Sequence, residues 1–223
     1  MISVLKILAS FLIGAIPFAK VAMLGTGIDI TQAGSKNPGF NNVLRVTKDW
    51  RRAGIALVGD ISKGYLALLL LGYGEVSAMS LWLIGIAAVA GHCWSPFLRF
   101  NGGKGVATTV GVLLSLEPRI TLICLPLYPI LRFLGRKVHW RQEGAIASLS
   151  TMFVISAVVL GLRGTQPGIF AYLMFAIVFI RHTPNLREIL HEGAANRTPR
   201  IARIKIRAIR GLFKAFKGRI TSY

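Results

Sequence analysis

The chain has 223 residues, of which 53% are hydrophobic and only 16% are charged, and its mean hydropathy is positive. Soluble domains usually hold about 45–50% apolar residues, so this composition argues against a water-soluble fold. Lys and Arg number 27 against 8 Asp and Glu, which gives a net charge of +19. This excess indicates an anionic partner: nucleic acid, anionic lipid or a phosphorylated substrate.

Long apolar runs predict an all-α protein that crosses a membrane several times. A helix needs about 17–25 apolar residues to cross the ~30 Å hydrocarbon core. Four runs reach that length and three are shorter, so we expect about seven transmembrane helices. The long runs are Ile2–Leu24, Ala53–Tyr73, Ser77–Leu98 and Gly144–Leu162, and the shorter runs are Val106–Leu116, Ile120–Leu134 and Gly168–Ile180.

Charge is distributed unequally between the segments that connect these runs. If seven spans alternate in direction, most Lys and Arg residues fall on one side, which the positive-inside rule assigns to the cytoplasm. We therefore expect the N-terminus outside and the C-terminus in the cytoplasm. The first run lacks a small-residue cleavage site followed by a polar domain, so we interpret it as a retained span. The opposite side receives only Glu75, Glu117, Arg119 and Arg163.

The composition changes after Ile180, because the last 43 residues hold eleven Lys or Arg against two Glu. Apolar residues recur there every three or four positions with basic residues between them, which is typical of an amphipathic helix. We expect a transmembrane domain over residues 1–193 and a basic amphipathic tail over 194–223. The tail suits a surface of anionic lipid; recruitment of nucleic acid is the alternative. Its apolar positions are Ile201, Ile204, Ala208, Leu212, Phe216 and Ile220.

A glycine-rich segment over residues 34–45 follows the first run. Glycines let the backbone turn so that N–H groups converge on an anion, and Arg45 adds a planar cationic fork. The segment predicts a phosphate site; the alternative is a polar turn whose residues only shape the connection. Its glycine and polar residues before Arg45 are Gly34, Ser35, Lys36, Asn37, Gly39, Asn41 and Asn42.

A second glycine-rich segment, Phe100–Thr108, leads into an apolar run. Its three glycines, Gly102, Gly103 and Gly105, surround Lys104 at the expected N-terminus of a helix. That arrangement offers amide donors, a positive dipole end and a mobile ammonium, all suited to phosphate. The spacing G-x-x-x-x-G-K-[ST] of a nucleotide-hydrolysing loop is absent. The alternative is a flexible re-entry loop beside lipid headgroups.

Polar residues also lie within and after the apolar runs. Asp60 and Lys63 are three residues apart on one helical face, and we expect a self-neutralising pair that braces the loops rather than a proton relay. We expect His92 to hydrogen-bond locally. Arg181 and His182 follow the last run, where such residues often anchor a helix at the membrane interface.

The sequence offers no metal site and no covalent nucleophile. Cys93 and Cys124 both lie in apolar runs, which favours small buried residues over a disulfide or metal pair. No Ser-His-Asp or Cys-His order and no metal-spaced His/Cys set occurs at the two glycine-rich segments or after the last run. We therefore expect no metal and no cofactor, and an enzyme would act by positioning and electrostatic stabilisation.

At these residues the sequence resembles the bacterial acyl-phosphate:glycerol-3-phosphate acyltransferase family, over roughly residues 10–193. Each motif is weak alone, but the motifs occur in family order and at family-like intervals. They are Gly14-Ala15-Ile16-Pro17-Phe18, residues 34–45, Asp60-Ile61-Ser62-Lys63-Gly64, Gly91-His92-Cys93, Phe100–Thr108, and Arg181-His182 with Asn185.

The resemblance implies a seven-span protein of the bacterial cytoplasmic (inner) membrane with its site on the cytoplasmic side. It implies transfer of a fatty acyl group from acyl phosphate to the 1-hydroxyl of glycerol 3-phosphate, which gives lysophosphatidic acid and phosphate for phospholipid biosynthesis. The implied partners are these two substrates and membrane lipids, without nucleic acid. The chemistry needs no protein nucleophile, because a mixed anhydride is already activated and its departing phosphate can accept the hydroxyl proton.

Carried over residue by residue, the resemblance implies a pocket built by both glycine-rich segments and the end of the last span. The segments cradle phosphate, and the cationic side chains hold the anionic groups. The implied catalytic residues are Ser35, Arg45, Lys104, His182 and Asn185. The implied phosphate-binding residues are Gly34, Asn37, Gly39, Asn42, Gly102, Gly103 and Gly105.

Three residues of the first segment depart from the family pattern. Lys36 stands where the family usually has Gly, Phe40 where it has Ala, and Asn41 where it has Thr. These changes can reshape the loop, because only Gly enters some backbone regions without cost. They motivate the alternative hypothesis of a non-catalytic relative or a transporter that binds phosphate or anionic lipid through the same loops.

Overall fold

The computed structural model describes residues 4–74 and 77–197, with side chains up to residue 190. All regular structure in these ranges is helical, which confirms the all-α class. The chain divides into two units, residues 1–183 and 184–223, and the described part of the second unit is the end of a helix. Most of the expected tail, residues 198–223, lies outside the described residues, so the domain boundary at residue 193 stays a prediction.

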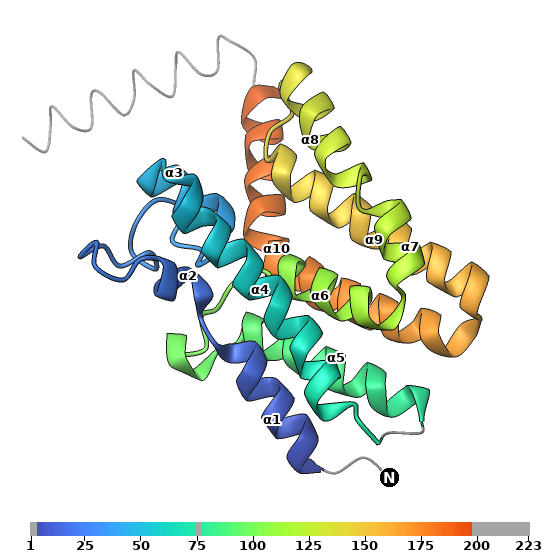
Figure 1. Ribbon diagram of the computed structural model, residues 1–223. Coiled ribbons are helices and arrows are strands. Elements are labelled where there is room, and N and C mark those ends of the chain that lie inside the picture. Colours follow the sequence, from blue (N-terminus) through green and yellow to red (C-terminus); the bar gives the residue numbers. More distant parts are fainter. Residues whose placement is uncertain (1–3, 75–76, 198–223) are drawn as a thin grey trace, which may run out of the picture. The chain divides into compact units, whose positions relative to one another are not determined.

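The helices follow one another through short connections, and the longest loop precedes α3 (Figure 1). A short 3-10 helix, η1 (Pro96–Leu98), follows α5. The α-helices are α1 (Val4–Ala15), α2 (Phe18–Ala22), α3 (Phe40–Thr47), α4 (Trp50–Leu71), α5 (Ala78–Cys93), α6 (Val106–Leu116), α7 (Pro118–Cys124), α8 (Leu127–Lys137), α9 (Glu143–Arg163) and α10 (Thr165–Arg197).

Within the described residues, six helical segments are long and apolar enough to cross a membrane, which agrees with a multi-pass protein. The remaining expected run, Val106–Leu116, forms α6. Its 11 residues extend about 16 Å, which is roughly half of the ~30 Å hydrocarbon core. The seven-span count and the orientation of the termini stay predictions. The six segments are Val4–Ala22, Trp50–Leu71, Ala78–Leu98, Pro118–Lys137, Glu143–Arg163 and Thr165–Leu190.

Prolines interrupt two of the expected runs. Pro17 separates α1 from α2, and Pro126 divides the expected run Ile120–Leu134 into α7 and α8. Proline has no N–H to donate to the preceding turn, so a helix ends or bends there. The first break leaves the carbonyl oxygens of Ala15 and Ile16 to accept hydrogen bonds from the side chains of Ser95, between α5 and η1, and Lys63, in α4.

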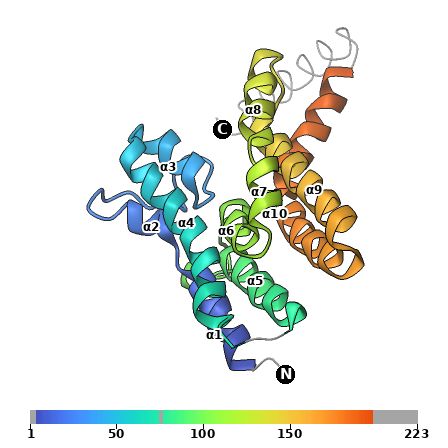
Figure 2. The same ribbon diagram turned by 45° about the vertical axis from the view of Figure 1, so that its right-hand side comes forward.

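Glycines let two helix pairs approach closely, α1 with α5 and α4 with α6 (Figure 2). A Cβ atom on any of these glycines would collide with backbone atoms of the facing helix. Close backbone approach through small residues is the usual way in which helices associate in a membrane, where lipid removes most of the hydrophobic drive. The glycines are Gly14 and Gly91 in the first pair, and Gly64 and Gly111 in the second.

We expect Gly111→Ala to lower the free energy of unfolding by about 1–3 kcal/mol, because the added methyl group would collide with the backbone carbonyl of Ile61. Gly161→Ala is the matched control, because nothing lies within 4 Å of its added Cβ. That control should gain up to about 1 kcal/mol from helix propensity. Thermal unfolding midpoints in detergent micelles measure both, and equal shifts would contradict the close α4–α6 contact.

Candidate functional site

The first glycine loop is held together by one buried amide side chain. Asn42 accepts a hydrogen bond at Oδ1 from the backbone N–H of Ser35 at 2.8 Å, and its Nδ2 donates to the carbonyls of Ile30 and Ala33 at 3.2 and 3.0 Å. Only 2% of Asn42 is exposed. Gly34 has φ +59°, and a Cβ there would collide with the Asn42 amide. In this structure Asn42, expected to bind phosphate, braces the loop.

The three residues that depart from the family pattern have defined places. Lys36 has φ +59°, a left-handed conformation that costs a non-glycine residue about 1–2 kcal/mol. The ring of Phe40 lies 6.2 Å from that of Trp50, measured between centroids. The Oδ1 atom of Asn41 accepts a hydrogen bond from Arg132 at 2.8 Å. The strain is thus confined to Lys36, while the other two residues make contacts.

The second glycine loop is fixed by its own amides and by an arginine. The N–H groups of Gly102 and Gly103 donate to the carbonyls of Cys93 and His92 at the end of α5, each at 3.1 Å. Arg181 Nη2 donates to the Gly102 carbonyl at 2.7 Å, and its Nε donates to the Gly103 carbonyl at 3.0 Å. A Cβ at either glycine would collide with His92. These glycines therefore let the loop pack closely against His92, and their N–H groups point to the end of α5.

Arg181 is a functional candidate that the sequence analysis placed in a family motif and at the membrane interface but did not count among the expected site residues. Its guanidinium also lies 6.0 Å from the ring centroid of Trp94. By holding the loop that carries Lys104, Arg181 positions the expected phosphate-binding lysine. The signals available in the sequence were its place directly before His182 and its membership of the family motif.

A buried charged cluster lies beneath both loops. The predicted ion pair is confirmed: Lys63 Nζ lies 2.8 Å from Asp60 Oδ1, with 2% and 4% of the two side chains exposed. Lys63 also donates to the carbonyl of Ile16 at 2.7 Å, at the break between α1 and α2. His92 Nδ1 lies 3.4 Å from Asp60 Oδ1, longer than an ordinary N–H···O hydrogen bond.

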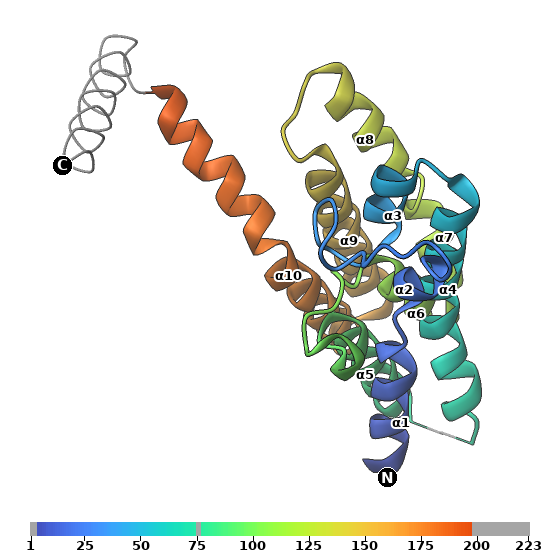
Figure 3. The ribbon, with the colours of Figure 1, turned by 90° about the vertical axis from the view of Figure 1, so that its left-hand side faces the viewer.

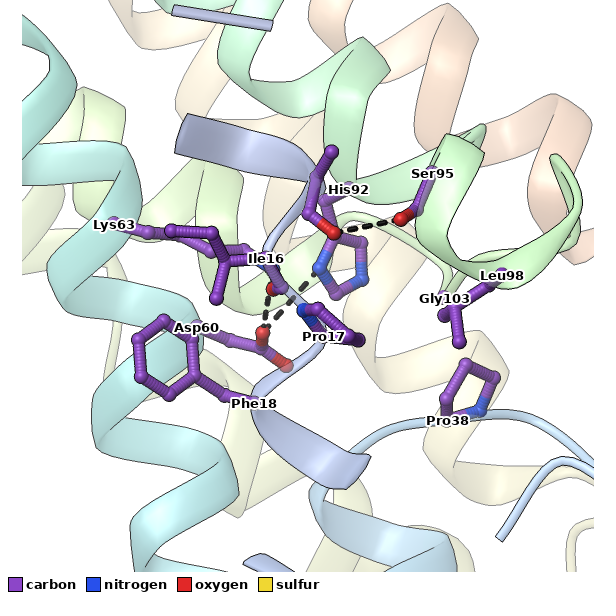
Figure 4. A pocket seen from close by; sticks show the side chains of 11 residues that line it. Ile16, Pro17, Phe18, Pro38, Asp60, Lys63, His92, Ser95, Leu98 and Gly103 are labelled. Atoms are coloured by element: carbon purple, nitrogen blue, oxygen red, sulfur yellow. Dashed lines mark hydrogen bonds and ion pairs between the residues drawn. The ribbon is translucent and has the colours of Figure 1, made fainter. Parts of the chain in front are cut away.

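The two glycine loops meet at a small cavity above this cluster. Pro38 of the first loop and Gly103 of the second line one side, and Asp60 and Lys63 line the other (Figure 4). The cavity has room for about one water molecule, so it supports the loops and does not hold a substrate.

Each loop leads directly into the N-terminus of a helix. Gly39 precedes α3, and Gly105, with φ +84°, precedes α6. Neither N-cap residue makes a side-chain capping hydrogen bond within the described part of the chain. Such helix ends present backbone N–H groups and a positive dipole, which favour phosphate. The helix start predicted after Gly105 is confirmed.

The remaining predicted site residues lie in different settings. Ser35 and Arg45 are exposed and Asn37 is partly buried. His182 is buried, with Nδ1 donating to the Val178 carbonyl at 2.8 Å and Nε2 3.2 Å from Ser148 Oγ on α9. Lys104 lies between Gly103 and Gly105 on the second glycine loop and is partly buried.

Asn185 belongs to the second unit of the chain, whereas the other predicted site residues belong to the first. Its part in the site stays a prediction that rests on the resemblance alone.

Comparison with known proteins places these features in one family. Residues 4–192 match the glycerol-3-phosphate acyltransferase family. The chain belongs to this family. Curated relatives named glycerol-3-phosphate acyltransferase include those of Nitratiruptor sp., 36% identical over 84% of this chain and 92% of the relative, and of Aromatoleum aromaticum, 38% identical with the same coverage.

The fold also matches a solved membrane enzyme. The crystal structure of PlsY, an integral membrane glycerol 3-phosphate acyltransferase, in its glycerol 3-phosphate form aligns with a TM-score of 0.72 and 25% identity, over 84% of this chain and 92% of that one. Its lysophosphatidic acid form aligns with a TM-score of 0.71 and 24% identity. The family and the all-helical, integral-membrane class expected from the sequence are thus confirmed.

We expect Lys63→Met to lower the free energy of unfolding by about 3–5 kcal/mol, because it leaves the buried Asp60 carboxylate without its cation. The double variant Asp60→Leu with Lys63→Met removes both charges and should cost less than the single change. Thermal unfolding in detergent compares the two. A double variant that is less stable than the single one would contradict an electrostatic brace.

We expect Lys36→Gly to raise the free energy of unfolding by about 0.5–1 kcal/mol, because relief of the left-handed strain exceeds the entropy that glycine adds to the unfolded chain. Lys20→Gly is the control: Lys20 lies in α2, where glycine should cost up to about 1 kcal/mol. Chemical denaturation in micelles measures both. Equal losses of stability would show that Lys36 is not strained.

Proposed function

We propose that this chain transfers a fatty acyl group from acyl phosphate to the 1-hydroxyl of glycerol 3-phosphate, forming lysophosphatidic acid and inorganic phosphate in phospholipid biosynthesis. Family membership supports glycerol 3-phosphate as the acceptor, because the matched relatives carry that activity in their names. The PlsY structures carry glycerol 3-phosphate and lysophosphatidic acid in their descriptions.

One observation carries the proposal: two glycine loops lie beside the same cavity, and each ends at a helix N-terminus whose N-cap residue is a glycine, without a side chain to cap it. Each substrate brings one phosphate, and each helix end suits one phosphate. The Gly102 and Gly103 amides already donate to carbonyls of α5. The proposed backbone donors to phosphate are therefore the amides in the first turns of α3 and α6.

The reaction needs positioning and charge stabilisation. The 1-hydroxyl oxygen of glycerol 3-phosphate forms a bond to the acyl carbon, and the bond between that carbon and the bridging phosphate oxygen breaks. The hydroxyl proton passes to the departing phosphate, so that no protein nucleophile is consumed. Cations fixed beside the phosphates stabilise the charge that develops on the leaving group.

The chain's residues divide this work in the proposal. Arg45 and Lys104 hold the two phosphates, and Ser35 donates to a phosphate oxygen from the exposed first loop. His182 is held between α9 and α10 by its two ring nitrogens and orients the acceptor. Asn185 keeps the role that the resemblance implies.

The proposed setting is the bacterial cytoplasmic membrane, with the loops at the cytoplasmic surface. Residues 1–193 form the proposed catalytic domain and residues 194–223 the proposed attachment to anionic lipid. Metal and cofactor play no part in the proposed reaction.

A non-catalytic relative that binds phosphate or anionic lipid is the second candidate function. The observation that favours it is the left-handed Lys36 in the first loop, at a position where strain can displace neighbouring donors by small distances. This candidate requires binding of glycerol 3-phosphate without release of phosphate from acyl phosphate.

We expect purified protein given acyl phosphate and glycerol 3-phosphate to form lysophosphatidic acid and release phosphate in equal amounts. Lys104→Ala should lower kcat/KM at least about 100-fold, because a cation that stabilises the leaving group is lost. Lys137→Ala, at the C-terminal end of α8, should leave the rate unchanged. No transfer by a folded sample, under conditions in which a relative is active, would reject the acyltransferase and favour the second candidate.

A further inference from the structure

A second, larger concavity is lined by residues of α3 and α8 and by their neighbours. These two helices lie toward the same end of the first unit (Figure 3). The concavity is a groove of about 460 Å³, within the size range of ligand pockets. Its lining comes from Asn41, Leu44, Arg45, Lys48, Trp50 and Arg132.

The groove is strongly cationic. Its lining includes Arg45, Lys48 and Arg132, and no carboxylate among the residues that the structure describes. Arg132 Nε lies 3.9 Å from Oε1 of Glu143, which is outside the lining. The same oxygen lies closer to Arg136, at 3.7 Å from its Nε. Glu143 therefore leaves most of the groove's charge uncompensated, and an anion would bind there favourably.

One of these cations is fixed before any ligand arrives. Arg132 Nη1 donates to Asn41 Oδ1 at 2.8 Å and to the Tyr128 hydroxyl at 3.1 Å, and 23% of its side chain is exposed. A guanidinium held in this way loses little side-chain entropy on binding. Asn41, which departs from the family pattern, supplies the link between α8 and α3.

The groove also has an apolar component. Leu44 and Trp50 contribute to its lining, and 70% of Trp50 is exposed. An exposed indole beside cations is typical of the membrane–water interface, where the ring contacts acyl chains and the cations contact phosphate. A free phosphate ion would use the cations alone, whereas a lipid with a phosphate head and an acyl chain would use both components.

We propose that the groove between α3 and α8 binds the phosphate headgroup of a single-chain membrane lipid. Resting on the proposed function, this lipid is acyl phosphate on its way in and lysophosphatidic acid on its way out. Arg45 belongs both to the groove and to the proposed catalytic set, so it connects the two places. The headgroup that reaches the two glycine loops from the bilayer is thereby selected by Lys48, Trp50 and Arg132.

The test uses the full chain in nanodiscs of phosphatidylcholine. Arg132→Gln removes the fixed cation, and Arg136→Gln is the matched control, since Arg136 lies one turn further along α8, is 63% exposed and also faces Glu143. We expect Arg132→Gln to weaken binding of lysophosphatidic acid about tenfold and to raise the KM for acyl phosphate by a similar factor. The KM for glycerol 3-phosphate and the behaviour of Arg136→Gln should stay at wild-type values.

Lysophosphatidylcholine and inorganic phosphate are the reference ligands. We expect both to bind the wild-type protein more weakly than lysophosphatidic acid, because the first has no net negative charge and the second has no chain. Equal binding of all three, equal effects of the two arginine variants, or a raised KM for glycerol 3-phosphate alone would overturn the proposal. Lys48→Gln provides a second variant if Arg132→Gln does not fold, with the same expected loss.

Measuring the binding of lysophosphatidic acid distinguishes a failure of this proposal from a failure of the proposed function. Wild-type protein that binds lysophosphatidic acid selectively but transfers no acyl group would keep the groove and reject the acyltransferase. Protein that transfers acyl groups, but whose Arg132→Gln variant binds lysophosphatidic acid normally, would keep the enzyme and reject the groove.

Discussion

The buried ion pair between Asp60 and Lys63 is the interaction on which the rest of this structure depends. A charge inside a membrane helix is costly unless it finds a partner, and Lys63 has two: the Asp60 carboxylate and the carbonyl of Ile16. That carbonyl is accessible because Pro17 ends α1. The pair thus ties α4 to the break between α1 and α2. His92, beside Asp60, extends the cluster to the second glycine loop.

Positive charge performs two distinct tasks in this chain. Lys63 and Arg181 hold backbone carbonyls in place: Lys63 binds the carbonyl of Ile16 between α1 and α2, and Arg181 binds two carbonyls of the second glycine loop. Arg45, Lys48 and Arg132 instead line an open groove. The high net charge therefore includes cations that hold the site together and cations that attract anions. Lys and Arg serve both tasks, and the surroundings of each side chain decide which task it has.

The residues that depart from the family pattern fall into two groups as well. Lys36 introduces strain in the first loop, whereas Phe40 and Asn41 contact Trp50 and Arg132 at the edge of the groove. In the proposed enzyme these last two changes alter the approach of the lipid substrate more than the chemistry at the loops. The strain at Lys36 is local, because Asn42 continues to hold the loop through three hydrogen bonds.

Apolar run length, helical spacing and motif order are properties of neighbouring residues, so the sequence predicts the apolar helices, the two glycine loops, the Asp60–Lys63 pair and the family. The contacts of Arg181 with the second loop, and of the Gly102 and Gly103 amides with α5, become visible in the folded chain alone. The fold alone also brings Arg132 to Asn41. Those contacts join residues far apart in the chain, and their partners are chosen by how helices pack, which local pattern does not encode.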